Sequence, residues 1–208
     1  MNQLVSPAPE TTEQLARLLG TNHVLIQCLR RLETLDLPHW YLGAGCIAQT
    51  VWNAAHARQP NAGIDDYDIV YFDPDLAVEA EHTIRLHVQH VLADLPIEPD
   101  VKNQARVHLW YEPKFGYRIR PYTSCEDAIA SWPTTATAVG IRYKEGALHV
   151  EAPFTLHDLL GLVVRPNRVQ ITPEIYHAKV DRWRSIWPRL DIRSWADGVG
   201  AIGDRRAV

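Results

Sequence analysis

Cysteine is scarce in this sequence. The 208 residues include only three, Cys28, Cys46 and Cys125, which lie far apart. No CxxC pair is present, which excludes the usual ligand spacing of a structural zinc site, and three distant thiols do not make a disulfide framework. The sequence therefore predicts reduced cysteines, as is typical of cytoplasmic proteins.

Long apolar runs and a surplus of one charge are also lacking. No segment is apolar over the length that a bilayer requires, and the N-terminus, MNQLVSPAPETTEQL, has no basic start followed by an apolar stretch. We therefore expect a soluble cytoplasmic protein with no membrane partner. A net charge of −4 and a pI of 6.2 argue against a broad basic surface for nucleic acid, although they are compatible with a local basic patch.

Helical patterns occupy the two ends of the chain. Residues 1–10 are rich in proline, and we expect them to be irregular. Thr11 is placed to begin a first helix with a capping box, and Asn22 is placed to cap a second. Thr172-Pro173 predicts the start of the last helix. The residues after 197 combine glycine and arginine, and we expect this tail to fray.

Strand and helix patterns alternate between these ends. Residues 39–42 predict a short strand, and a helical pattern follows the glycine turn after it. Residues 65–72 predict a second strand and residues 97–111 a third. Asp73-Pro74 is expected to begin the helix between them. Further predicted elements are a helix capped by Ser124, a hairpin over residues 136–152 and a short helix from Thr155.

Two acids stand at the start of the second predicted strand. Successive side chains on a strand point to opposite faces, so Asp66 and Asp68 project to the same side. Carboxylates that close repel each other, and a divalent cation such as Mg²⁺ relieves the repulsion. Two such ions can hold the attacking and leaving oxygens of a phosphoryl displacement. An isolated DxD is more often a solvated strand start, so its sequence context decides between the two interpretations.

The turn Gly43-Ala44-Gly45-Cys46 joins the first strand to its helix. Glycines let the backbone approach an anion closely, and the free amides of a helix N-terminus point toward it. The turn is therefore a candidate phosphate cradle, although a tight turn without a ligand has the same sequence. Neither GxGxxG nor GK[ST] is complete, which excludes the dinucleotide-binding and P-loop motifs.

A third acid, Asp100, lies on the third predicted strand. It could complete a metal site or act as general base toward an acceptor hydroxyl, and the alternative is an aspartate of a surface loop. On a strand, Lys102, Gln104 and Arg106 would share its face. Lys102 could neutralise a triphosphate, whereas Arg106 is better explained by a structural ion pair or an exposed charged face.

This order of motifs resembles the nucleotidyltransferase superfamily, which includes the DNA polymerase beta-like enzymes. The pattern of that superfamily is a Gly-Gly or Gly-Ser turn, then D-x-D or D-x-E, then a separate acid. More narrowly, the sequence is similar to a bacterial nucleotidyltransferase-like family of unassigned substrate, formerly a domain of unknown function. The similarity covers most of the chain after residue 40 and rests on Gly45–Asn53, Asp66–Asp73, Val101–His108, Trp132–Gly140 and Ala152–Phe154.

The resemblance implies an α+β fold with a small mixed β-sheet flanked by helices, in a single domain over residues 1–208. Within this domain we expect N-terminal helices in 1–38, a catalytic core in 39–125, and a hairpin and helices in 126–208. By the resemblance, the catalytic and metal-binding acids, for Mg²⁺ or Mn²⁺, would be Asp66, Asp68 and Asp100. The residues that hold the nucleoside triphosphate, with ATP as the default nucleotide, would be Gly43, Gly45, Cys46 and Lys102.

The implied reaction moves a nucleoside monophosphate from a nucleoside triphosphate to an acceptor hydroxyl or phosphate and releases pyrophosphate. The acceptor is unknown, and a small molecule and a tRNA end both remain open. Cys46 stands where the superfamily usually has serine, and the gap between the turn and the DxD is longer than in minimal members. The loss of that hydroxyl favours an alternative, a non-catalytic nucleotide-sensing or protein-interaction module, whereas the three acids argue against it. A metal-dependent phosphohydrolase is a third option.

Overall fold

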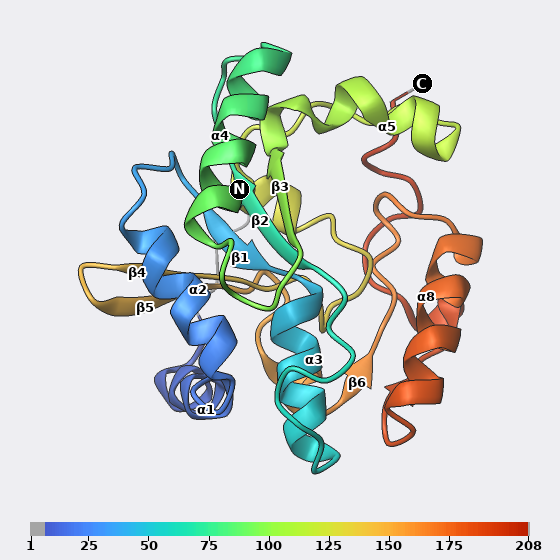
Figure 1. Ribbon diagram of the computed structural model, residues 1–208. Coiled ribbons are helices and arrows are strands. Elements are labelled where there is room, and N and C mark those ends of the chain that lie inside the picture. The colour runs from blue at the N-terminus through green and yellow to red at the C-terminus, as the bar shows by residue number, and fades with distance from the viewer. Residues whose placement is uncertain (1–6, 208) are drawn as a thin grey trace.

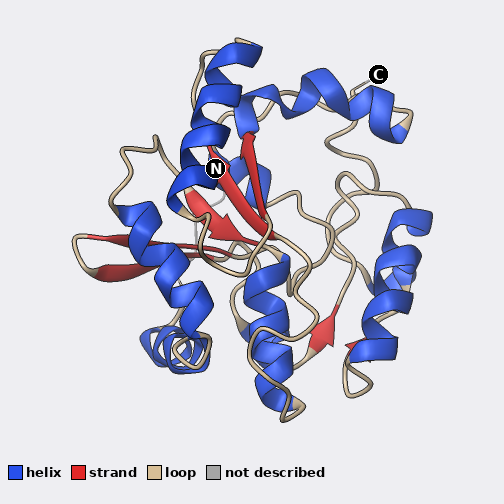
Figure 2. Ribbon diagram, viewed as in Figure 1, coloured by secondary structure: helices blue, strands red, loops and turns tan. Residues whose placement is uncertain are grey.

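Five strands form the central sheet of this protein, in the order β3-β2-β1-β4-β5. The computed structural model describes residues 7–207 (Figures 1 and 2). Strands β2 and β3 run parallel, whereas the other neighbours are antiparallel. The predicted α+β fold with a small mixed sheet is thus confirmed. The strands are β1 (Tyr41–Gly43), β2 (Tyr67–Tyr71), β3 (Pro99–Asn103), β4 (Gly140–Lys144) and β5 (Ala147–Glu151), and a separate parallel pair is β6 (Val163–Val164) with β7 (Asp191–Ile192).

Helices cover both faces of the sheet. The α-helices are α1 (Pro9–Leu19), α2 (His23–Glu33), α3 (Gly45–Ala55), α4 (Val78–Val91), α5 (Val107–Phe115), α6 (Cys125–Ile129), α7 (His157–Leu160) and α8 (Pro173–Ile186). Two 3-10 turns are η1 (Gln104–Arg106) and η2 (Trp195–Asp197). Among the described residues, no helix has the length and apolar character needed to cross a membrane.

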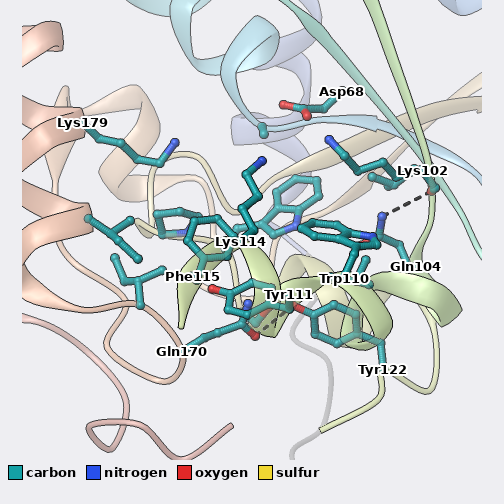
Figure 3. Close-up of a pocket in the computed structure, with 18 residues that line it drawn as sticks. Asp68, Lys102, Gln104, Trp110, Tyr111, Lys114, Phe115, Tyr122, Gln170 and Lys179 are labelled. Carbon is teal, nitrogen blue, oxygen red and sulfur yellow. Dashed lines mark hydrogen bonds between the residues drawn. The ribbon is translucent and has the colours of Figure 1, made fainter. Parts of the chain in front are cut away.

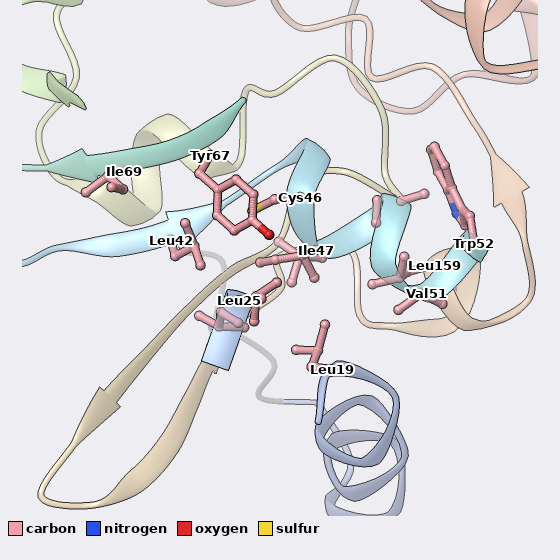
Figure 4. Close-up of a cluster of buried hydrophobic side chains, with 14 of the residues drawn as sticks. Leu19, Leu25, Leu42, Cys46, Ile47, Val51, Trp52, Tyr67, Ile69 and Leu159 are labelled. Atoms are coloured by element: carbon pink, nitrogen blue, oxygen red, sulfur yellow. The ribbon is translucent and has the colours of Figure 1, made fainter. Parts of the chain in front are cut away.

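Strand alternation divides β2 between two environments. Tyr67, Ile69 and Tyr71 are fully buried in the main core, where helices α2 and α3 contribute Leu25 and Ile47 (Figure 4). The intervening residues face the other side of the sheet. There Val70 packs against α6, and Asp68 stays partly exposed. One strand therefore serves the core with one face and presents a carboxylate with the other.

Tryptophan contacts hold α8 against α3. The Trp52 ring of α3 lies 5.2 Å from the Trp183 ring and 5.3 Å from the Trp187 ring, both in edge-to-face geometry. Thr172 caps α8 by accepting a hydrogen bond from the Ile175 amide. The start predicted for the last helix at Thr172-Pro173 is confirmed. The tryptophan packing fixes where the rest of α8 lies relative to the sheet.

Three predicted helix starts are wrong, and one of them is the start at Thr155, because α7 begins at His157. Helix α1 begins at Pro9, so Thr11 lies inside the helix, and residues 1–6 of the expected irregular stretch lie outside the described residues. Helix α4 begins only at Val78. The Asp73 carboxylate accepts from the Asp75 amide, which forms an Asx turn of the kind that competes with helix.

The third strand is shorter than predicted. β3 ends at Asn103, whose side-chain oxygen accepts hydrogen bonds from the amides of Ala105 and Asp73, each 3.1 Å away. This side chain caps η1, and the chain continues as helix α5 through residues that we expected in the strand. Gln104 and Arg106 therefore do not share a strand face with Asp100. Arg106 is buried and pairs with Glu81, with 2.8 Å between Nε and Oε2.

The C-terminal tail is ordered rather than frayed. The amides of Gly203 and Arg205 donate to the carbonyls of Arg168 and Val169, at 2.9 and 2.8 Å. The Arg206 guanidinium donates to the Gln170 and Ile171 carbonyls and lies over the Tyr117 ring. Backbone and guanidinium hydrogen bonds order this segment, and apolar periodicity does not reveal such bonds.

Candidate functional site

Parallel pairing of β2 with β3 brings the predicted acids together. Asp68 and Asp100 are directly opposite in the register, and Asp66 precedes Asp68 on the same side of the chain. One carboxylate oxygen from each of the three lies within 4.8 Å of the others. Asp66 is exposed, whereas Asp68 and Asp100 are partly buried. The cluster therefore opens to solvent on one side and rests on the sheet on the other.

The charge of this cluster is incompletely balanced. Burial, with a further contribution from the Asp66 charge, raises the pKa of Asp68 to about 7, although Lys102 and Lys179 oppose the shift. The Lys102 ammonium forms an ion pair with Asp100. Burial and the neighbouring carboxylates disfavour the ionised form of Asp68. A bound cation would stabilise that form.

The donor set fits a hard divalent cation. All three groups offer carboxylate oxygen, which suits Mg²⁺ or Mn²⁺, and nitrogen and sulfur ligands are absent from the cluster. The oxygen atoms are close enough together for a shared ion. Asp66, Asp68 and Asp100 are therefore able to hold the metal that the sequence motifs imply.

The glycine turn has a tightly packed backbone. A Cβ atom at position 43 would lie 2.3 Å from the Cη2 atom of Trp132, so Gly43 is required for that indole to pack on β1. Ala44 has a φ of 55°, a left-handed conformation that costs a non-glycine residue energy. Its amide donates to the Val139 carbonyl at 3.0 Å, which helps to hold this conformation.

Cys46 points its side chain away from the acids. The thiol is fully buried beside Tyr67 and donates to the Gly43 carbonyl (Figure 4). Burial raises the pKa of this thiol well above its usual value. Only the backbone amides at the start of α3, those of Gly45 and Cys46, are therefore left to meet an anion at this turn. Ala44, at the same turn, lines the cavity described next.

A chamber of about 440 Å³ opens beside Asp68. Three lysines from three different elements line it: Lys102 of β3, Lys114 of α5 and Lys179 of α8. Their ammonium groups extend toward Asp68 in Figure 3. Burial lowers the pKa of Lys179, and the neighbouring Asp68 opposes that shift. The end of the chamber nearest the acids is therefore rich in positive charge.

The opposite end of the chamber is aromatic and polar. Helix α5 contributes Trp110, Tyr111 and Phe115 to the lining. Tyr111, Tyr122 and Gln170 lie on the side away from Asp68 (Figure 3). The chamber thus changes from cationic to aromatic over its length, and its volume is within the usual range for a small-molecule site.

A second cavity, of about 430 Å³, meets the acids from the β3 edge of the sheet. Asp66 and Asp100 line it, together with Arg85 and Gln89 of α4. Lys102 and Trp110 line both cavities. We refer to this second cavity as the edge groove. The acids consequently lie where two separate approaches converge.

Several residues of the chamber were missed by sequence reasoning. Val107, Trp110, Tyr111 and Lys114 follow the i, i+3, i+4, i+7 spacing of one helix face, a signal hidden by the interpretation of residues 97–111 as a strand. Lys179 lies one helical turn before Trp183 on α8, and the apolar spacing of that helix indicates core packing rather than a binding site. Nothing in the local sequence singles out Ser131 or Gln170.

Comparison with known proteins agrees with the fold and the motifs. A family model described as Nucleotidyltransferase matches residues 30–192. One solved structure, described as an NMR structure that reveals a CCA-adding enzyme head domain, matches with a TM-score of 0.69 and 25% identity. The match covers 91% of this chain and 97% of the other. No curated protein matches.

Proposed function

The chain belongs to the nucleotidyltransferase family, and on this premise we propose that it moves a nucleoside monophosphate from a nucleoside triphosphate to an acceptor, with Asp66, Asp68 and Asp100 as the metal-binding acids. The observation that carries the proposal is the meeting of these three carboxylates with a chamber that presents three lysines. Acids for metal and lysines for phosphate are the two requirements of phosphoryl transfer. ATP is the nucleotide to test first.

In the proposed reaction an acceptor oxygen attacks the α-phosphorus, and the bond from that phosphorus to the bridging oxygen breaks, so that pyrophosphate leaves. A divalent cation on the acids would offset the charge of the carboxylates and the phosphates. Asp66 and Asp68 would hold this ion. Asp100, directly opposite Asp68, would either share it or accept the proton of an attacking hydroxyl.

The cationic end of the chamber would bind the triphosphate. Lys114 and Lys179 are not paired with the acids by a short ion pair, so their ammonium groups can contact phosphate oxygens. When a cation binds the Asp100 carboxylate, the Lys102 ammonium can leave its ion pair with Asp100 and contact a phosphate oxygen instead. The amides of Gly45 and Cys46 add neutral donors at the same end.

The edge groove would admit the acceptor, because it reaches Asp66 and Asp100 from outside the chamber. The likeness to a CCA-adding enzyme head domain makes a tRNA end one acceptor to test. The net charge of −4 favours a small molecule as the other. The non-catalytic nucleotide-sensing module stays as the alternative outcome, because Cys46 supplies no hydroxyl to the phosphate site.

Calorimetric titration of ATP with Mg²⁺ tests the proposal. Wild type should bind the nucleotide only when the metal is present, and Asp66→Asn/Asp68→Asn should lose this binding while its circular dichroism stays that of a folded protein. Glu145→Gln, at the exposed turn between β4 and β5, is the matched control and should bind like wild type. Absence of metal-dependent binding of ATP, GTP, CTP and UTP to wild type would contradict the proposal.

A further inference from the structure

The aromatic end of the chamber has chemistry that phosphate binding does not use. The lysines near Asp68 supply positive charge for a triphosphate, and the lining continues past them to aromatic rings and the buried amide of Gln170 (Figure 3). A flat, uncharged group attached to the triphosphate would meet these residues.

We propose that the aromatic end of the chamber binds the nucleobase of the triphosphate, and that Gln170 contacts the edge of that base. The proposal rests on the proposed function and names the part of the substrate that the chamber recognises. Its basis is the order of groups along the chamber, with cations beside Asp68, rings next and an oriented amide farthest away (Figure 3).

Helix α5 supplies a continuous aromatic wall. The ring centroids of Tyr111 and Phe115 are 4.4 Å apart, and those of Trp110 and Tyr111 are 6.1 Å apart. All three side chains line the chamber. Every base has a π-face that stacks on such rings, and each stacked base contributes affinity with little dependence on its identity. Stacking here would add affinity that a bare triphosphate lacks.

Lys114 links this wall to the phosphate end. Its Nζ atom lies 5.5 Å from the Trp110 ring centroid and 5.4 Å from that of Phe115. The Lys114 ammonium therefore lies near the rings on which a nucleoside would stack, where it could contact the phosphates attached to that nucleoside. The wall and the lysines therefore form parts of one site, with the ring wall beyond the cations.

Gln170 is rigidly held at the far side. Its side-chain Oε1 accepts from the Tyr122 hydroxyl at 2.8 Å, and that hydroxyl also contacts Ser131 at 2.7 Å. Its carbonyl accepts from Tyr117 and from Arg206, each at 3.0 Å. These contacts orient the amide, and its Nε2 group is left to face the Tyr111 hydroxyl, another part of the chamber lining.

An oriented amide can distinguish bases, whereas stacking cannot. The Nε2 group donates hydrogen bonds, so it favours a base that places a carbonyl or ring-nitrogen acceptor against it. Gln170 is almost fully buried, at 5% exposure, and an unmatched donor there would lose its hydrogen bonds to water. We therefore assign base preference to Gln170 and general base affinity to the wall.

The test compares ATP, GTP, CTP and UTP with inorganic tripolyphosphate, each titrated by calorimetry with Mg²⁺. Wild type should bind at least one nucleotide about tenfold or more tightly than tripolyphosphate. Trp110→Ala and Phe115→Ala, tested separately, should lose about tenfold in nucleotide affinity and keep tripolyphosphate affinity. Leu109→Ala, an exposed neighbour on α5 outside the lining, is the matched control.

Selective loss of nucleotide affinity in either aromatic variant supports the proposal. Equal affinity of wild type for tripolyphosphate and for all four nucleotides overturns it and leaves the proposed function standing. Absence of metal-dependent binding for every ligand removes the proposed function as well. Gln170→Leu gives a second, independent readout, because it should change the order of the four nucleotide affinities and leave tripolyphosphate unchanged. An unchanged order in a folded Gln170→Leu variant overturns the assignment of base preference.

Discussion

The ten residues of the paired strands β2 and β3 alternate between two faces, and these faces differ in chemistry. One face places Tyr67, Ile69 and Val101 in the main core, where exposure is at most 4%. The other places Asp68 and Lys102 in the lining of the chamber and Asp100 in the lining of the edge groove. Alternation along each strand separates the residues that stabilise the fold from those that carry charge.

The comparison also shows why the charged face depends on the apolar one. Asp68 and Asp100 meet because the strands pair in parallel register, and that register is specified by burial of the residues between them. A shift by one residue would turn the acids into the core. Substitutions on the two faces should therefore have opposite consequences for stability and for ligand binding.

The largest expected effect is a loss of metal affinity after a substitution on the charged face. Asp68→Asn should weaken Mn²⁺ binding by at least about a hundredfold, because it removes a charged ligand at the centre of the acid cluster. Electron paramagnetic resonance of free Mn²⁺ measures the affinity. Equal Mn²⁺ affinity in wild type and Asp68→Asn would show that the cluster is not the metal site.

The next largest effect is a loss of stability after a substitution on the apolar face. Ile69→Ala removes a fully buried side chain and should lower the free energy of unfolding by about 3 kcal/mol. Thermal unfolding should then occur about 6–12 °C lower. Mn²⁺ affinity, measured well below that temperature, should stay that of wild type. A large loss of metal affinity in the folded variant would mean that the two faces are not separable.

A smaller effect on stability, an increase rather than a decrease, is expected from a substitution on the charged face. Because the pKa of Asp68 is raised to about 7, the folded protein retains a proton that the unfolded chain releases at lower pH. Stability of the metal-free protein should therefore fall as pH rises from about 4 to about 7 and level off above that. Asp68→Asn carries no charge and should be more stable than wild type by about 2 kcal/mol near pH 8, and by little near pH 4. Urea unfolding at both pH values measures this, and a destabilised variant at the higher pH would contradict the account.

The smallest effect separates phosphate binding from metal binding. Lys179→Ala should weaken binding of ATP with Mg²⁺ about tenfold, because a charge-assisted contact to phosphate is lost. It should not weaken binding of Mn²⁺ alone, since removal of a nearby positive charge favours a cation. Lys144→Ala, exposed at the hairpin turn, is the control and should bind both ligands like wild type. Parallel loss of both affinities in Lys179→Ala would place the lysine in the metal site.

The acid cluster could be predicted from sequence because its signal is local. Two acids alternate on a strand at Asp66 and Asp68, and the glycine turn and Asp100 occur in an order typical of one superfamily. The structure places these acids together as the pattern indicated. Their roles in binding and catalysis stay predictions that the experiments above address.

The chamber could not be predicted because its residues come from distant segments. Lys179 reaches the acids only through tryptophan packing of α8 on α3, and Gln170 is oriented by Tyr122 and by Arg206 of the tail. Apolar periodicity does not reveal such contacts. The alternation of Val101, Asn103 and Ala105 also resembles that of a longer strand. The strand nevertheless ends at Asn103, whose side chain caps η1, and α5 with its aromatic wall follows η1.

Paramagnetic broadening of backbone amide signals by Mn²⁺ in the presence of ATP tests the central claim most directly, because it locates the ion. The account predicts that signals of residues around Asp66, Asp68, Asp100 and the start of α3 disappear first, while those of the β4–β5 turn near Gly146 persist. Broadening centred elsewhere, or none at a saturating Mn²⁺ concentration, would contradict the assignment of these acids to a nucleotidyltransferase metal site.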